Sequence, residues 1–263
     1  MTSLDAGRLD YVALTEHIRV ADSDQSGIVR DAALAYVEAR DSGTATIATA
    51  LHVGGLNAIK TAFFPEALQR ARLVYADGVA VVLLAKLAGA ANIRRAATTD
   101  IGIPVVEAIA KIENRPARVA LVGGRADLAE IAGAKLGTMT NVELVFATDG
   151  YKDHVEWQAA IADLRNSNPD IILLGIGSPQ ELIFADRYLA DMPPALIMTC
   201  GGWFGFLAGD ERRAPALLRA TGFEWLGRLA QDPRRLAVRY GLGAFTFASM
   251  GIKIVTRRMG IWR

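Results

Sequence analysis

Short runs of apolar and β-branched residues alternate along the chain with longer amphipathic stretches. The short runs predict strands, each ending in Gly, Asp or Thr, and the amphipathic stretches have the length of helices. Residues 171–174 are apolar without alternation, which is typical of a strand covered on both faces in a parallel sheet. The predicted strands cover residues 44–49, 72–76, 117–122, 142–148, 170–175 and 194–200, and the predicted helices cover 78–87, 101–112, 127–136, 153–166 and 181–189.

This alternation predicts an α/β fold, with a doubly wound, Rossmann-like and mostly parallel sheet. After about Gly209 the β pattern stops, and a helical, arginine-rich appendage follows. We therefore expect two domains, residues 1–209 and residues 210–263. Ligands of such sheets bind beyond the carboxyl ends of the strands, so the loops there should converge on one crevice. These loops are Asp77–Gly78, Gly123–Gly124, Asp149–Tyr151, Gly175–Gln180 and Gly201–Gly202.

The composition fits a folded protein with a large core. Of the 263 residues, 52% are hydrophobic, and 29 Lys and Arg nearly balance 28 Asp and Glu, which excludes a disordered chain. The single cysteine, Cys200, excludes a disulfide framework and is expected to be a buried small hydrophobe. Residues 1–10 contain no apolar run, so we expect no secretory signal and a cytoplasmic protein. No run approaches the roughly 18 to 20 apolar residues of a spanning helix.

The charge is distributed unevenly along the chain. From Gly201 to Arg263 there are 11 Lys and Arg residues against four Asp and Glu, so this part carries +7 and the remainder −6. The asymmetry indicates an anionic partner for the appendage, either phosphate groups or an anionic membrane surface. A nucleic acid is not expected, because no recognised nucleic-acid motif is present. The alternative to membrane binding is an ordinary amphipathic helix docked on the domain.

Two glycine-containing turns between a strand and a helix are candidates for binding an anion. At Gly123-Gly124, unpaired backbone N–H groups and the helix dipole would attract a phosphate, and the alternative is a plain tight turn. In the run from Gly175 to Glu181, Ser178 can cap the helix and Pro179 suits its first position. Capping and ligand binding therefore both explain the second turn.

Polar side chains near the ends of the predicted strands are candidates for chemistry. Asp77 ends a hydrophobic strand, where a carboxylate can take a proton from a hydroxyl nucleophile, although Asp-Gly is also a common turn. Arg94 and Arg95, with Thr98, Thr99 and Asp100, either bind a phosphate or form a loop in which Asp100 caps the next helix.

Metal-binding patterns are weak in this chain. Asp22-Ser23-Asp24 matches the DxD pattern that binds a divalent ion and nucleotide-sugar phosphates in other enzymes. It precedes the first predicted strand, so we interpret it as a solvated loop. His17, His52 and His154 lack ligand spacing and belong to no HExxH or Ser/His/Asp arrangement, and His154 is expected at the surface.

A specific combination of motifs runs through the second half of the chain and extends upstream. The motifs near the C-terminal end are Cys200–Gly209, Arg213-Ala214-Pro215, Gly222–Leu226, Arg228-Leu229 and Asp232–Arg235. The motifs that precede them in the chain are Ala76–Val79, Arg95–Asp100, Leu121–Gly124, Asp149–Tyr151 and Gly175–Pro179. Together these motifs resemble the signature of the WecG/TagA/CpsF glycosyltransferases. The likeness covers roughly residues 44–240.

The resemblance implies an inverting, metal-independent enzyme without a cofactor. Such an enzyme would move a hexose-type sugar from a UDP-sugar to a polyprenyl-diphosphate-linked saccharide in cell-surface or exopolysaccharide biosynthesis. It would work as a peripheral protein on the cytoplasmic face of the inner membrane, bound to an anionic membrane surface. Residues 1–209 would bind the UDP-sugar and residues 210–263 the acceptor and the membrane. Whether the chain forms a homo-oligomer is left open.

The resemblance also implies roles for individual residues. Asp77 matches the proposed catalytic base, Thr49 matches a threonine that lines the site after the first strand, and Arg95 matches an arginine before a threonine-rich loop. The acceptor diphosphate and the membrane would contact Arg213, Arg228, Arg234, Arg235 and Arg239. The other expected substrate-binding residues are Thr98, Asp100, Gly123, Gly124, Tyr151, Gly177, Ser178, Gln180 and Glu181, and no metal ligand is expected.

Three positions depart from the family pattern. Leu51 stands where an asparagine is usual, the loop Pro179-Gln180-Glu181 is one residue shorter than the usual Pro-Lys-Gln-Glu, and Gly205 replaces an aspartate. The changes fit either a different sugar donor or a loss of activity. Two other functions are therefore kept as alternatives: a catalytically inactive scaffold that binds lipid-linked sugars, and a nucleotide-dependent Rossmann oxidoreductase. The absence of GxGxxG disfavours the oxidoreductase.

Overall fold

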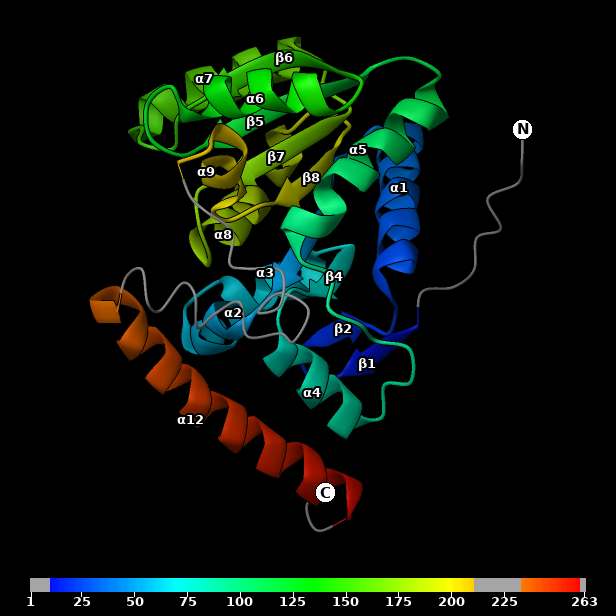
Figure 1. Cartoon of the computed structure of the whole chain (residues 1–263), viewed down its shortest axis with the longest axis vertical. Coiled ribbons are helices and arrows are strands. Elements are labelled where there is room, and N and C mark those ends of the chain that lie inside the picture. The colour runs from blue at the N-terminus through cyan, green and yellow to red at the C-terminus, as the bar shows by residue number, and fades with distance from the viewer. Residues whose placement is uncertain (1–9, 211–232, 261–263) are drawn as a thin grey trace.

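The computed structural model describes residues 10–210 and 233–260, and of residues 233–240 only the backbone. Its centre is a six-stranded parallel sheet with the order β4-β3-β8-β7-β5-β6 (Figure 1). The strands are β3 (Thr46–Leu51), β4 (Leu73–Ala76), β5 (Ala117–Gly123), β6 (Val142–Thr148), β7 (Ile171–Gly175) and β8 (Leu196–Thr199). All six were predicted from the sequence pattern, and the parallel, Rossmann-like fold class is confirmed.

Helices cover both faces of this sheet, which explains why its central strands are apolar on both sides. In β7 the residues Ile171 to Leu174 are all buried. One face carries α1 (Gln25–Ser42), α5 (Thr98–Glu113), α6 (Leu128–Met139) and α9 (Trp203–Ala208). The other face carries α2 (Val53–Asn57), α3 (Phe64–Arg70), α4 (Val79–Ala88), α7 (His154–Asn166), α8 (Gln180–Arg187) and α12 (Pro233–Arg258).

The helices predicted from amphipathic stretches are present, with different caps in two cases. Helix α5 begins after Ala97, so Asp100 lies in its first turn and does not cap it. Helix α8 begins after Pro179 and has no side-chain cap, so the expected capping by Ser178 is wrong. The reason is local geometry: Pro179 occupies the cap position instead of the first helical position.

The segment before β3, to which no element was assigned from the sequence, is also folded. A hairpin of β1 (Tyr11–Ala13) and β2 (Arg19–Ala21) lies beside β4, and the Tyr11 hydroxyl donates to the Arg72 carbonyl at 2.7 Å. Asp24 caps α1, because its Oδ1 accepts the Gly27 N–H at 2.9 Å. The carboxylate of Asp24 therefore belongs to a helix start.

The long C-terminal helix α12 packs across α2 and α4 at one end of the molecule (Figure 1). Met250 and Ile254 are buried against the domain, and a Cβ added at Gly243 would lie only 2.3 Å from Val53 Cγ2. The Arg258 guanidinium also donates to the Leu87 carbonyl of α4 at 2.9 Å. A helical C-terminal segment is thus confirmed, and it is docked on the sheet domain. The boundary at residue 210 stays a prediction.

Candidate functional site

The loops at the carboxyl edge of the sheet are joined to one another by backbone hydrogen bonds. The Gly124 N–H donates to the Gly175 carbonyl at 3.1 Å, and the Gly150 N–H donates to the Gly124 carbonyl at 2.9 Å. Gly123 has a φ of 134°, and a Cβ there would lie 2.4 Å from the Gly175 carbonyl oxygen. Only glycine fits at this close approach. The loops after β5, β6 and β7 are therefore joined to one another, and the single crevice formed by all five loops stays a prediction.

The same bonds correct one expectation about this surface. The sequence suggested that unpaired N–H groups at Gly123-Gly124 and near Gly177 would attract a phosphate. In the structure the Gly124 N–H is bonded to Gly175, and the Gly177 N–H points to the Glu181 carboxylate at 3.3 Å. These N–H groups serve to connect loops. The Gly124 and Gly177 N–H groups are therefore already engaged within the protein.

Thr49 lies within β3, and not after the strand as the sequence suggested, because β3 extends to Leu51. Its side chain is 3% exposed, and its hydroxyl lies 2.9 Å from the hydroxyl of Thr199 on the neighbouring strand β8. Thr199 Oγ1 also accepts the Ala50 N–H at 3.3 Å. Thr199 was missed because its partner is 150 residues away, and no local pattern reveals such a pair.

Asp77 follows β4 directly and lies beside the end of β3. Its N–H donates to the Leu51 carbonyl at 3.0 Å, and the carbonyl of the preceding Ala76 accepts the Ala96 N–H at 2.8 Å. Asp77 is half-buried at the carboxyl edge of the sheet. Gly78 caps α4, and a Cβ there would lie 3.8 Å from His52 Cβ. The candidate base is thus held between two backbone segments, close to the end of β3.

Leu51 explains one departure from the family pattern. Its side chain is 0% exposed and belongs to the core on the face of α3 and α8. A Cβ added at Gly55 would lie 2.9 Å from its Cδ1. An apolar side chain fits this buried position, so the side chain at position 51 contributes packing while its carbonyl holds Asp77.

The segment from Arg95 to Asp100 lies beside Asp77 along the same edge. The Arg95 guanidinium is 3.6 Å from the Asp100 carboxylate, and both side chains are about one-quarter exposed. Thr98 is buried, and its hydroxyl is 2.8 Å from that of Tyr75, whose pKa is raised well above its ordinary value by burial. Thr98 therefore has a structural partner, while Arg95 and Asp100 are accessible to a ligand.

Two cations at the edge were not among the residues proposed from the sequence. Arg125, directly after Gly124, pairs with Asp210 at 2.6 Å, and Lys152 pairs with Asp149 at 2.8 Å. The Lys152 ammonium and the Tyr151 N–H lower the pKa of Asp149 below its ordinary value. Tyr151 itself is 82% exposed. The signal for both cations was their position directly beside a predicted loop.

The remaining residues that were singled out from the sequence differ in how exposed they are, and some lie outside the described residues. In α8, Gln180 is exposed, whereas the neighbouring Glu181 is buried and bonded to backbone N–H groups. Ser178 is half-buried in the loop before them, and Gly205 is buried in α9. Arg213 and Arg228 lie outside the described residues, as do the side chains of Arg234, Arg235 and Arg239.

The acidic residues of the DxD pattern make structural contacts. Asp22 accepts the N–H groups of Ala91 and Asn92 at 2.9 and 2.8 Å, and Asp24 caps α1. Within residues 10–210 and 233–260, no three His, Cys, Asp or Glu side chains are grouped as metal ligands. His52 caps α2 through Nδ1, and His154 is exposed as predicted. Cys200 is buried, as predicted, and burial raises the pKa of its thiol.

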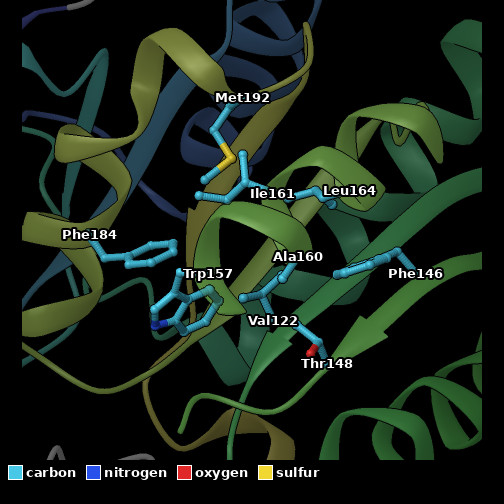
Figure 2. A pocket seen from close by; sticks show the side chains of 9 residues that line it. All are labelled: Val122, Phe146, Thr148, Trp157, Ala160, Ile161, Leu164, Phe184 and Met192. Carbon is cyan, nitrogen blue, oxygen red and sulfur yellow. The ribbon is translucent and has the colours of Figure 1, made fainter. Parts of the chain in front are cut away.

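One small cavity lies away from this edge. It lies between the sheet, α7 and α8, and apolar side chains such as Trp157, Phe184 and Met192 line it (Figure 2). Its volume of about 10 Å³ is at the lower limit for one water molecule. We interpret it as a gap in the packing of the tilted Trp157 and Phe184 rings, whose centroids are 4.5 Å apart.

A parallel, doubly wound sheet with charged and glycine-rich loops at its carboxyl edge defines a Rossmann-like α/β protein, a fold that hosts many enzymes. The comparison of the sequence with known families makes this specific. Residues 17–259 match the model of the glycosyl transferase WecG/TagA/CpsF family, and the chain belongs to that family. It is thus a glycosyltransferase of cell-surface polymer synthesis. In the part of the chain that the structure describes, no helix is long and apolar enough to cross a membrane.

Proposed function

We propose that the protein moves a hexose-type sugar, with inversion and without a metal ion, from a UDP-sugar to a polyprenyl-diphosphate-linked saccharide. The acceptor oxygen forms a bond to the anomeric carbon while the bond from that carbon to the UDP oxygen breaks. The acceptor hydroxyl gives its proton to a base, and UDP leaves with the bonding electron pair. The site therefore needs a carboxylate on one side of the sugar and positive charge on the other.

Asp77 is the proposed base, and its position is the observation that carries the proposal. It is a carboxylate at the carboxyl edge of the sheet, half-buried, with its backbone bonded to Leu51. A base held in this way keeps its orientation toward a bound hydroxyl, which favours proton transfer.

Side chains are the proposed source of positive charge for the leaving UDP. Arg95 lies beside Asp77, close to the Asp100 carboxylate, whereas Arg125 and Lys152 follow β5 and β6, four and five strands farther along the sheet. A diphosphate carries more negative charge than one carboxylate, so it can replace Asp100 as the partner of Arg95. Arginines of the appendage would complete the binding of the acceptor diphosphate.

Attachment to the cytoplasmic face of the membrane is the second part of the proposal. Helix α12 is apolar on two opposite sides: Met250 and Ile254 are buried, whereas Phe245 and Ile252 are 76% and 65% exposed. Phe245 and Ile252 are seven residues apart and so lie on the same side of the helix. A helix with exposed apolar residues beside basic residues suits an anionic bilayer surface. The exposed basic residues of its last two turns are Lys253, Arg257 and Arg258.

Helix α4 extends this apolar surface. Val79, Leu83 and Leu87 are 39%, 46% and 41% exposed, at a spacing of four residues. Leu87 and Ile252 line the same open, apolar groove of about 410 Å³ between α4 and α12. The exposed apolar residues of the two helices are therefore continuous, which favours a shared contact with lipid.

The test is a panel of UDP-sugars with lipid-linked acceptors, scored by UDP release and by the anomeric configuration of the product. We expect one donor to give UDP release that depends on the acceptor, with an inverted linkage. A retained configuration would contradict the proposed mechanism. Binding of lipid-linked sugars without UDP release from any donor would favour the inactive scaffold, and binding of NAD without a response to UDP-sugars would favour the oxidoreductase.

A further inference from the structure

We infer that Glu181 is the positioning residue of the donor site: its carboxylate holds the loops after β7 and β8 together in the arrangement that the donor binds. The inference rests on the proposed function and gives Glu181, which the resemblance implied as a substrate-binding residue, a role beneath the surface of the site. Glu181 would touch neither sugar nor nucleotide. It would act through the loop that carries Ser178 and Gln180.

The geometry is that of one oxygen with two backbone donors from different loops. Glu181 Oε2 accepts the Gly201 N–H at 2.9 Å and the Gly177 N–H at 3.3 Å. The Glu181 N–H in turn donates to the Gly177 carbonyl at 2.9 Å. The side chain is 4% exposed, so it contributes to the interior and not to the ligand-facing surface.

Both donor residues are glycines in the left-handed region of backbone space. Gly177 has a φ of 95° and Gly201 a φ of 55°, and a Cβ added at either would meet nothing within 4 Å. The requirement for glycine is therefore conformational and not steric. In this backbone conformation, both N–H groups are directed toward the same carboxylate. The two loops and the glutamate thus form one structural unit.

A carboxylate suits this position better than a neutral side chain. Hydrogen bonds from N–H groups to an ionised oxygen are stronger than neutral ones, and the first turn of α8 favours negative charge. Burial raises the pKa values of the nearby Cys200 and Tyr75, and the Glu181 carboxylate contributes a smaller part of both shifts.

The consequence concerns Gln180, the residue next to Glu181. Gln180 is exposed at the start of α8, and Ser178 precedes it in the same loop. Because Glu181 ties this loop to Gly201, the positions of Ser178 and Gln180 relative to β8 are set before a donor arrives. Loss of the carboxylate should therefore weaken donor binding more than acceptor binding.

The experiment compares Glu181→Ala and Glu181→Gln with the wild type in the full-length chain. The matched control is Glu130→Ala, which removes an exposed glutamate from the first turn of α6. Amide hydrogen exchange is measured for the peptides that contain Gly177 and Gly201, without any substrate. Donor KM, acceptor KM and kcat are measured separately.

We expect Glu181→Ala to raise exchange at both glycines and to raise the donor KM, each by about tenfold or more, because a hydrogen bond to a charged group is lost. Glu181→Gln keeps one acceptor oxygen and should lie between Glu181→Ala and the wild type. Glu130→Ala should change neither quantity. If Glu181→Ala does not fold, Glu181→Gln carries the comparison.

Unchanged exchange at Gly177 and Gly201 in a folded Glu181 variant would overturn the inference, and so would equal increases in donor and acceptor KM. The exchange measurement needs no sugar substrate. A wild-type protein that transfers no sugar would therefore contradict the proposed function, while raised exchange in the variants would still support the role of Glu181 in holding the loops.

Discussion

The hydroxyl groups of Thr49 and Thr199 lie 2.9 Å apart in the middle of the sheet and join β3 to β8. Strand β3 belongs to the half of the sheet that presents Asp77, and β8 belongs to the half that presents the glycine loops. This buried pair therefore connects the two halves of the candidate site. Thr199 makes a second bond to β3, because its oxygen also accepts the Ala50 N–H.

We expect Thr49→Val to lower the free energy of unfolding by about 1 kcal/mol and Thr199→Val by about 1 to 3 kcal/mol, because the second change also leaves a backbone N–H without its acceptor. Chemical denaturation of both variants and of the double variant measures this. The double variant should lose less than the sum of the two, since one bond is shared. Strict additivity would show that the two hydroxyls do not interact.

Replacement of the proposed base tests the chemistry. Asp77→Asn should slow sugar transfer by on the order of 10² to 10⁴ and leave folding and donor binding intact, which is the usual size of a general-base contribution. Asp127→Asn is the matched control, because Asp127 is exposed at the start of α6 and its side chain makes no cap bond. Transfer by Asp77→Asn within a few-fold of the wild type would remove Asp77 from the mechanism.

The contact between α5 and α9 should depend on a glycine. A Cβ at Gly102 would lie 2.3 Å from the buried ring of Trp203, so Gly102→Ala should destabilise the fold by about 1 to 3 kcal/mol. A smaller side chain, as in Trp203→Leu, should reduce this cost. Gly137→Ala in α6 is the control, since nothing lies within 4 Å of its Cβ, and it should stabilise the helix by about 0.5 to 1 kcal/mol. Thermal unfolding of the wild type, of Gly102→Ala, Trp203→Leu and their double variant, and of the control measures these differences.

Metal independence is tested directly in the transfer assay. We expect the rate to survive excess EDTA, because the proposed positive charges for the leaving UDP are arginine side chains. The assay should use protein purified without divalent ions. Abolition of transfer by EDTA with recovery in Mg²⁺ or Mn²⁺ would assign the diphosphate to a metal ion.

The exposed apolar side of α12 should govern membrane attachment. The double change Phe245→Glu and Ile252→Glu should weaken co-sedimentation with anionic vesicles by about tenfold or more, because it replaces apolar contacts with charge repulsion. High salt should weaken attachment of the wild type only in part, since salt screens the electrostatic contribution alone. Val155→Glu, at a 71% exposed position of α7, is the control. Equal vesicle binding by all three proteins would show that α12 only caps the domain.

The periodicity of the sequence was enough to predict all six strands of the main sheet and the helices α4 to α8, because burial on both faces leaves an unbroken apolar run such as Ile171 to Leu174. The short helices α2, α3 and α9 were not predicted. Helix α1 was missed, since its start at Asp24 coincides with a pattern that also resembles a metal-binding loop. The contacts of Glu181 and Thr199 were beyond prediction. Both depend on which strands become neighbours, and strand order is not encoded in local spacing.

Helix α4 begins two residues after Asp77, and its exposed Val79, Leu83 and Leu87 belong to the proposed lipid-facing surface. Two residues span at most about 7 Å of backbone, so Asp77 lies within that distance of the first lipid-facing side chain. With this surface on the bilayer, the base would work at the depth of the lipid phosphates. A base at this depth can accept a proton only from acceptor hydroxyl groups close to the bilayer surface. We therefore expect it to act early in chain assembly, on acceptors whose first sugars lie next to the diphosphate, and to leave the growing ends of long glycans to other enzymes.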